Sequence, residues 1–244
     1  MLASAYRVVF RRRKVPKSAI PLDLFRGRGL EVGGPSLFFR HSLPIYRVAA
    51  SVDGLNFADE TMWEGSLREG QAFRCGSQVL GTQNLGEATD LSKFADASFD
   101  FVLSCHSLEH VANPLKALTE WRRVLKNGGH LVLALPNKSA IFDHRRPTTT
   151  MSHLLDDFNS NIGEDDLTHL PEILELHDLS RDRAAGSLEN FTQRSRLNVQ
   201  NRGLHHHVFD LPLLREIFEF LNITEVSSYE SYYDHVIVGK TSRS

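Results

Sequence analysis

The sequence predicts an α/β fold built around a mainly parallel sheet. Short apolar runs with strand composition alternate with segments of helical periodicity, and a glycine-rich turn follows the first apolar run directly. Acidic residues stand at the ends of several apolar runs. A chain of 244 residues with 41% apolar content can bury the core of one large domain. No apolar run approaches the roughly 18 residues that a membrane-spanning helix needs.

The first elements are expected in residues 29–56. Residues 29–32 form a short apolar run, and the glycine turn that follows it puts Pro35 where a helix would begin, a position that tolerates proline. Residues 47–54 predict a second strand, which ends on Asp53 and a glycine. Residues 54–82 have weak periodicity and predict loop with short helix.

The later elements have clearer patterns. Residues 99–105 are typical of a central parallel strand. Asn113 and Pro114 open the clearest helix, and Asn127-Gly128-Gly129 is typical of a helix C-terminus. A buried strand, an amphipathic helix and a closing strand pair are then expected at residues 130–136, 211–221, 223–229 and 234–240.

Charge and composition divide the chain into segments. Residues 1–28 hold eight basic side chains and one acid, so residues 1–26 are expected to be a basic N-terminal arm. This arm is Arg-rich and acid-poor, as transit peptides are, although a solvated arm is the simpler interpretation. Residues 27–244 are expected to be a single domain with an insertion at 138–207. That insertion is polar and acidic, and it is either a solvated helical face or a lid over a ligand site.

The overall charge and the cysteines limit the partners. A formal net charge of −2 predicts no nucleic-acid partner, and a small-molecule or glycan ligand is expected instead. Cys75 and Cys105 have no metal-binding spacing, which is typical of a reducing, cytoplasmic compartment. The pattern does not determine an oligomeric state.

Polar residues gather where the predicted strands end. Ligands bind open α/β sheets at the carboxyl ends of their strands. Glu31 and Asp53 are 22 residues apart, the length of one strand–loop–helix–loop–strand unit, so a carboxylate is expected where it could accept hydrogen bonds from a ribose diol. Gly33-Gly34 lacks the third glycine of a dinucleotide fingerprint, and a tight turn alone would also explain the pair.

Taken together, the motifs resemble those of class I S-adenosylmethionine-dependent methyltransferases, close to methyltransferase type 11. The resemblance covers roughly residues 26–137 and rests on six segments in order: Leu30–Pro35, Val52-Asp53, Thr89–Leu91, Ser98–Ser104, His106–Val111 and Arg123–Gly129. It implies a Rossmann-like, mainly parallel seven-stranded sheet with helices on both faces. It also implies a helical insertion before the last helix and strand pair, and S-adenosylmethionine as the cofactor.

The resemblance further implies which residues bind that cofactor. Glu31 would contact the methionine ammonium, directly or through water, above the Gly33-Gly34 backbone. Asp53 would hold the ribose hydroxyls. The adenine would be bound by the Asp90 carboxylate and the Leu91 N–H, and the floor beside the sulfonium would be lined by Ser104 and His106.

Two histidine motifs suggest metal chemistry. His106-x-x-Glu109-His110 matches the inverted zinc-protease signature, but scarcely one helical turn separates it from the helix that starts at Asn113-Pro114. A zinc-dependent hydrolase is therefore the alternative interpretation. His205-His206-His207 would alternate between two faces of an extended chain and so would not converge on one ion. We expect no metal.

The expected activity is methyl transfer from S-adenosylmethionine to a hydroxyl of a small-molecule or sugar acceptor. His144 and His206 are the candidate catalytic bases, because both lie in segments that flank the insertion. A non-catalytic cofactor-binding module is the remaining alternative.

Overall fold

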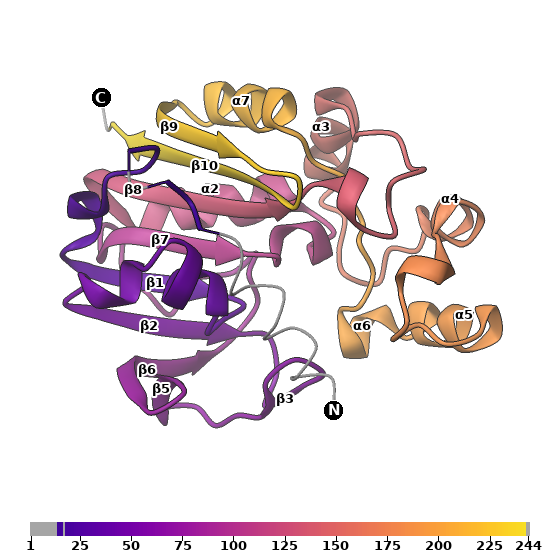
Figure 1. The fold of residues 1–244 in the computed structure, drawn as a ribbon, viewed down its shortest axis with the longest axis horizontal. Helices are drawn as coiled ribbons and strands as arrows, with labels where there is room; N and C mark the ends of the chain where they lie inside the picture. The colour runs from indigo at the N-terminus through magenta and orange to yellow at the C-terminus, as the bar shows by residue number, and fades with distance from the viewer. Residues whose placement is uncertain (1–13, 17, 243–244) are drawn as a thin grey trace.

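The computed structural model describes residues 14–16 and 18–242 and has an eight-stranded sheet at its centre (Figure 1). The strand order is β5-β6-β2-β1-β7-β8-β10-β9. The inner strands are parallel, whereas β10 runs antiparallel to both of its neighbours and β5 antiparallel to β6. The strands are β1 (Arg28–Val32), β2 (Ser51–Asn56), β5 (Ala72–Cys75), β6 (Gln78–Leu85), β7 (Phe99–Cys105), β8 (Leu125–Pro136), β9 (Ile223–Glu230) and β10 (Asp234–Thr241).

The predicted α/β sheet is thus confirmed, with one strand more than the seven expected. The additional strand is β5, which lies in the region predicted as loop. Its Phe73 is buried against β2, and a Cβ atom built on Gly54 would lie 2.3 Å from the Phe73 ring. A separate two-stranded sheet, β3 (Glu60–Thr61) and β4 (Gly65–Ser66), precedes it.

One face of the sheet is covered by α2 (Pro114–Val124) and α7 (Leu211–Phe220), which bury Trp121 and Leu214 against the strands. The Asn113 side chain caps α2 by accepting a hydrogen bond from the Lys116 N–H.

The prediction that α2 ends at Asn127–Gly129 is wrong. The helix ends at Val124, and Leu125 already belongs to β8. Leu125 pairs with Phe99 and His130 pairs with Phe101, so β8 carries the intervening glycines as an irregularity in its register.

In the described residues the second face is covered by 3-10 and π-helices and not by α-helices, so helices lie on both faces as predicted, but those on the second face are short. The chain forms only short 3-10 and π turns there: η1 (Leu22–Phe25), η2 (Phe38–Ser42) and η3 (Ile45–Arg47). No α-helix begins at Pro35. Pro44 cannot donate a helical hydrogen bond, and the Phe38 and Phe39 rings pack edge to face at 5.4 Å.

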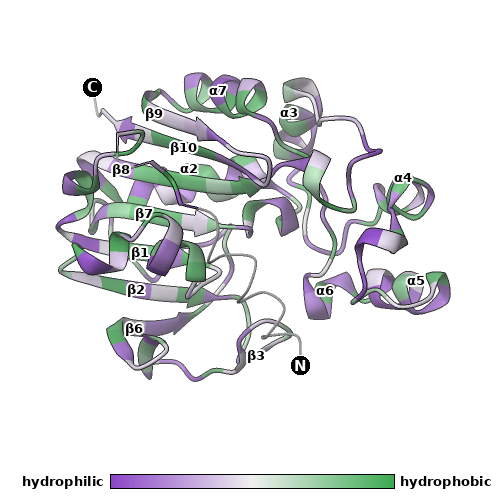
Figure 2. Ribbon diagram, in the orientation of Figure 1, coloured by the Kyte–Doolittle hydropathy of each residue, from purple (hydrophilic) through white to green (hydrophobic). Residues whose placement is uncertain are grey.

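The insertion lies beyond the carboxyl ends of the parallel strands (Figure 1). It contains α3 (Met151–Asn159), α4 (Leu170–Leu176), α5 (Leu188–Arg196) and α6 (Asn198–Asn201), with 3-10 turns η5 (Lys138–Ala140) and η6 (Leu179–Arg181). Leu170, Ile173, Ala185, Phe191 and Leu204 form a small core of its own. Hydrophilic residues cover much of these helices, in contrast to the apolar central strands (Figure 2).

Most of the basic arm lies outside the described residues. Within the described ranges, none of the helices has the length and apolar character needed to cross a bilayer.

Candidate functional site

Glu31, at the carboxyl end of β1, is completely buried. Its carboxylate accepts hydrogen bonds from the Tyr46 hydroxyl and from the Ser36 N–H, the latter at 3.0 Å. Burial raises the pKa of Glu31 to about 7. The carboxylate is therefore directed into the protein, where it holds the loop after β1. It is not exposed to an ammonium group.

Gly33 follows with a φ of 78°, a conformation that favours glycine. A Cβ atom on Gly33 would lie 1.7 Å from Oγ of Ser107, and one on Gly34 would lie 2.3 Å from Cδ of Glu31. The two glycines therefore allow the loop after β1 to pack tightly against the loop after β7. This agrees with a close backbone approach at this point.

Asp53 does not end its strand as predicted. It lies inside β2, where its carboxylate accepts hydrogen bonds from Arg28 at 2.7 Å and from the Thr82 N–H at 2.9 Å. Asn56 occupies the strand end instead, and its Nδ2 donates to the Gly34 carbonyl at 2.9 Å. The structure thus brings Asn56, and not Asp53, to the glycine loop.

The predicted adenine-binding pair is only partly placed for that role. Asp90 is exposed, and it accepts a hydrogen bond from the Ser92 N–H. The Leu91 N–H already donates to the Glu120 carboxylate at 2.9 Å. Sequence reasoning missed Glu87, which lies two residues after the end of β6. Its position beside the glycine at a strand end was the signal that could have identified it.

Ser104 and His106 lie where predicted, at and just beyond the carboxyl end of β7. The Ser104 hydroxyl is buried and has no hydrogen-bond partner among the described residues. His106 has a φ of 51°, and its Nε2 lies 2.8 Å from Oδ1 of Asp234 at the start of β10.

These strand ends fit the cofactor that the resemblance implies. S-adenosylmethionine is cationic at sulfur and has no phosphate, so it needs acceptor groups and close backbone approach more than a phosphate cradle. The buried Ser104 hydroxyl without a partner and the amide oxygen of Asn56 supply acceptors at the ends of β7 and β2. Glu87 follows β6, and its carboxylate pairs with Arg202 at 2.8 Å. Gly33 supplies the close approach between β1 and β7.

The His106-x-x-Glu109-His110 motif does not converge on one point. Only Glu109 and His110 share a cluster, and their third neighbour is His205 from the insertion, with candidate ligand atoms within 4.8 Å of one another. His110 hydrogen-bonds through Nδ1 to the Leu204 carbonyl. The zinc-protease arrangement predicted as an alternative is therefore not formed, although these three residues could hold a cation.

The three rings of the histidine triplet contact different partners. His205 Nδ1 lies 2.5 Å from Oδ2 of Asp143, His206 Nε2 accepts from the Asn198 amide at 2.9 Å, and His207 Nε2 lies 3.1 Å from the Ala112 carbonyl. The expectation that adjacent histidines do not meet at one ion agrees with this geometry.

Within the triplet, His205 is the residue that has the environment of a base. Burial lowers its pKa, but the carboxylates of Asp143 and Glu109 outweigh this effect and leave the pKa above its ordinary value. For His206, burial lowers the pKa to about 3, and the residue is 1% exposed. The prediction of His206 as a catalytic base is therefore not supported by its environment.

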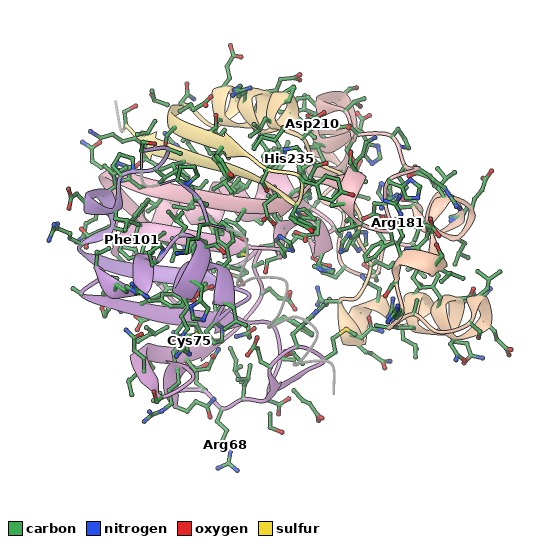
Figure 3. All side chains as sticks on the ribbon, viewed as in Figure 1. Arg68, Cys75, Phe101, Arg181, Asp210 and His235 are labelled. Atoms are coloured by element: carbon green, nitrogen blue, oxygen red, sulfur yellow. The ribbon has the colours of Figure 1, made fainter. Side chains whose placement is uncertain are left out.

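His144 also forms a histidine–carboxylate pair, as His106 and His205 do. Its Nε2 lies 2.8 Å from Oδ2 of Asp178, a carboxylate that Arg145 also approaches at 3.3 Å. In Figure 3 the labelled Arg181, whose Nε lies 3.8 Å from the same Asp178 oxygen, projects within the insertion. His144 thus belongs to a charged corner of the insertion.

A small cavity lies between the strand ends and the insertion. His205 and Glu109 line it together with Pro136, Lys138, Ile141, Asp143, His207, Val208 and Phe209. Its walls therefore combine two histidines, two acids, a lysine and apolar side chains contributed by both the sheet and the insertion.

Comparison with known proteins supports this assignment of the fold. Residues 40–133 match a methyltransferase domain family. The ubiquinone biosynthesis O-methyltransferase of Maricaulis maris is 31% identical over 97 residues, which are 40% of this chain and 36% of that protein. The chain spans 21% and 36% of the length of the curated relatives it matches.

Solved structures resemble the whole chain. A protein from Listeria monocytogenes assigned as an S-adenosylmethionine-dependent methyltransferase has a TM-score of 0.52 at 11% identity, over 99% of this chain and 100% of that one. A possible histamine N-methyltransferase from Thermotoga maritima has a TM-score of 0.50 at 16% identity, over 98% and 94%. The resemblance recognised in the sequence is confirmed: residues 40–133 match the methyltransferase domain, and the chain has the fold of class I S-adenosylmethionine-dependent methyltransferases.

Proposed function

We propose that this protein transfers a methyl group from S-adenosylmethionine to a hydroxyl of a small-molecule or sugar acceptor, with His205 as the base. The observation that carries the proposal is the 2.5 Å contact between His205 Nδ1 and Asp143 in a ring that lines the cavity beside the strand ends. The match to an O-methyltransferase over 97 residues supports an oxygen acceptor.

When bound, the cofactor supplies an electrophilic methyl carbon on its sulfonium. Asp143 accepts the Nδ1 proton of His205 and thereby fixes the tautomer in which Nε2 can take a proton. That nitrogen would remove the hydroxyl proton of the acceptor. Ile141 and Phe209 would exclude water from the cavity, and this strengthens the hydrogen bonds within it.

Asp143 is held in turn by Arg146, whose Nη1 lies 3.3 Å from Oδ1. Arg146 also donates to the backbone carbonyls of His205 and His206 at 2.7 and 3.0 Å. One buried guanidinium therefore fixes both members of the pair, and this agrees with a site whose geometry is set before the acceptor binds.

The experiment is a screen of hydroxylated acceptors with methyl-labelled cofactor, followed by separate measurements of turnover and cofactor affinity in His205→Gln. We expect turnover to fall about a hundred- to ten-thousandfold with cofactor affinity nearly unchanged. His144→Gln tests the His144–Asp178 pair in the same way. His130→Gln, on β8 and outside the cavity lining, is the matched control. Full turnover in His205→Gln would exclude His205 as the base.

A further inference from the structure

A second group of potential metal ligands lies inside the insertion, and one of its members, His207, also lines the cavity that holds His205. It comprises His153, Asp157, His169 and His207, and we call it the histidine–aspartate cluster. One candidate ligand atom from each of the four lies within 4.8 Å of the other three. His153 and Asp157 are four residues apart on α3, so they share one helix face. His169 precedes α4, and His207 lies between α6 and α7.

The interior of this cluster contains polar atoms that the protein does not satisfy. The exposed fractions of the Asp157 and His207 side chains are 9% and 0%. Among the described residues, Oδ2 of Asp157 and Nδ1 of His207 are buried without a hydrogen-bond partner. Buried polar groups are normally paired, and an unpaired carboxylate oxygen is especially unfavourable.

The distances suit a tetrahedral ion. Ligands 2.0–2.2 Å from zinc are roughly 3.3 Å from one another. Oδ2 of Asp157 lies 3.3 Å from Nε2 of His153. Nε2 of His153 and Nε2 of His169 are only 2.6 Å apart, and an ion between them would widen that separation by less than about 1 Å.

Groups behind the ligands would orient the rings. Nδ1 of His169 faces Oδ2 of Asp166 at 3.5 Å. Nε2 of His207 lies 3.1 Å from the Ala112 carbonyl oxygen and can donate its proton to it. Nδ1 is then the unprotonated nitrogen, whose lone pair is available to a metal ion. Metal-binding histidines characteristically donate their other ring N–H to a carboxylate or a carbonyl. His153, with 41% of its side chain exposed, leaves a route for an ion to enter.

We propose that His153, Asp157, His169 and His207 form a structural Zn²⁺ site that ties together three segments of the insertion. Three imidazoles and one carboxylate are a ligand set that zinc accepts, and four protein ligands complete a closed tetrahedral site. The Glu109–His110–His205 group differs, because it offers three ligands and not four, and two of them, Glu109 and His205, line the cavity. The zinc site revises our sequence-based expectation of no metal.

Zinc alone is the probe. The full-length protein is freed of metal with a chelator and titrated with ZnCl₂, with metal content measured by elemental analysis after gel filtration. We expect His153→Gln and His169→Gln each to lose one equivalent of zinc and at least about a hundredfold in affinity, because even residues behind the ligands contribute ten- to hundredfold. Cobalt substitution should give the intense visible absorption of a tetrahedral site in the unmodified protein and not in these variants.

Two controls separate this site from other histidines. His110→Gln removes a member of the Glu109 group and should keep the zinc that the His153 variant loses, and His130→Gln should behave as the unmodified protein does. Circular dichroism checks that the variants are folded, and His153→Gln is the least disruptive because that side chain is the most exposed of the four. Unchanged zinc content in both His153→Gln and His169→Gln, or no binding at micromolar zinc, would overturn the proposal.

Discussion

Glu31 carries a carboxyl group that folding removes from water, and its pKa rises from 4.5 to about 7 because burial disfavours the charged form. Between these two pH values the folded protein binds a proton that the unfolded chain has released. Stability must therefore fall as the pH rises from about 4.5 to about 7, by about 3 kcal/mol for this group.

The isosteric change Glu31→Gln should remove this part of the pH dependence. We expect the free energy of unfolding of the variant to vary less between pH 5 and pH 8 than that of the unmodified protein, and to be higher relative to it at pH 8. Urea unfolding at several pH values measures both. Parallel curves for the two proteins would show that Glu31 does not titrate in this range.

Single residues were the hardest feature to predict from the sequence. Val52-Asp53-Gly54 has the composition of a strand end, yet all three residues lie within β2. A glycine is needed at position 54 because the Phe73 ring packs where a Cβ atom would lie. The alternation argument for the histidine triplet agrees with the structure, but it could not reveal which residues the chain folds against each ring. For His207, the sequence signal that was overlooked is the four-residue spacing of His153 and Asp157, which places both on one face of α3 beside the His207 ring.

At the scale of elements, Arg146 joins the start of the insertion to its last segment. Its side chain is 2% exposed and pairs with Asp143, which is equally buried, and with Glu172. Arg146→Met would leave the Asp143 carboxylate without its guanidinium partner, so we expect a loss of about 3–5 kcal/mol in the free energy of unfolding. Urea denaturation measures it, and Arg145→Met, at a half-exposed neighbour, should cost far less.

The junction between β1 and β7 is equally restrictive. Gly33→Ala would place a Cβ atom 1.7 Å from Oγ of Ser107 on a backbone with φ of 78°. We expect a loss of about 1–3 kcal/mol from this combination of contact and strain, with weakened cofactor binding. Adding Ser107→Gly should restore only the part due to contact. Thermal unfolding and calorimetry of both variants test this, and a fully stable Gly33→Ala would contradict the packing described here.

Elements with strong periodicity or an explicit cap could be predicted, whereas those decided by tertiary packing could not. α2, α7 and the closing strand pair follow from their apolar spacing and the Asn113 cap. The π turn at Phe38–Ser42 depends on aromatic packing against the sheet, and β5 depends on an edge that β6 makes available. Neither signal exists in the local sequence.

At the scale of the whole molecule, Arg202 connects the strand ends to the insertion. Its guanidinium lies 2.8 Å from Glu87 after β6 and 2.9 Å from Glu164 in the insertion. A cofactor at 100 times its dissociation constant should stabilise the fold by about 2.7 kcal/mol. We expect cofactor binding also to slow amide hydrogen exchange in α5 and α6. In Arg202→Met, the slowed exchange should be lost before the stabilisation of the fold is. Equal protection in both proteins would remove Arg202 from the connection.

The two ends of the insertion meet at a pair of hydrogen bonds, from the Thr149 N–H to the Val208 carbonyl at 2.9 Å and from the Val208 N–H to the Thr149 hydroxyl at 3.0 Å. Because the chain leaves and returns at one point, the part of these 58 residues that follows α3 can lengthen or shorten with little effect on the central strands, whereas α3 itself packs into the core of the sheet through Leu154. Under the function proposed above, acceptor preference could therefore diverge through this segment while the strand ends proposed to bind the cofactor stay unaltered.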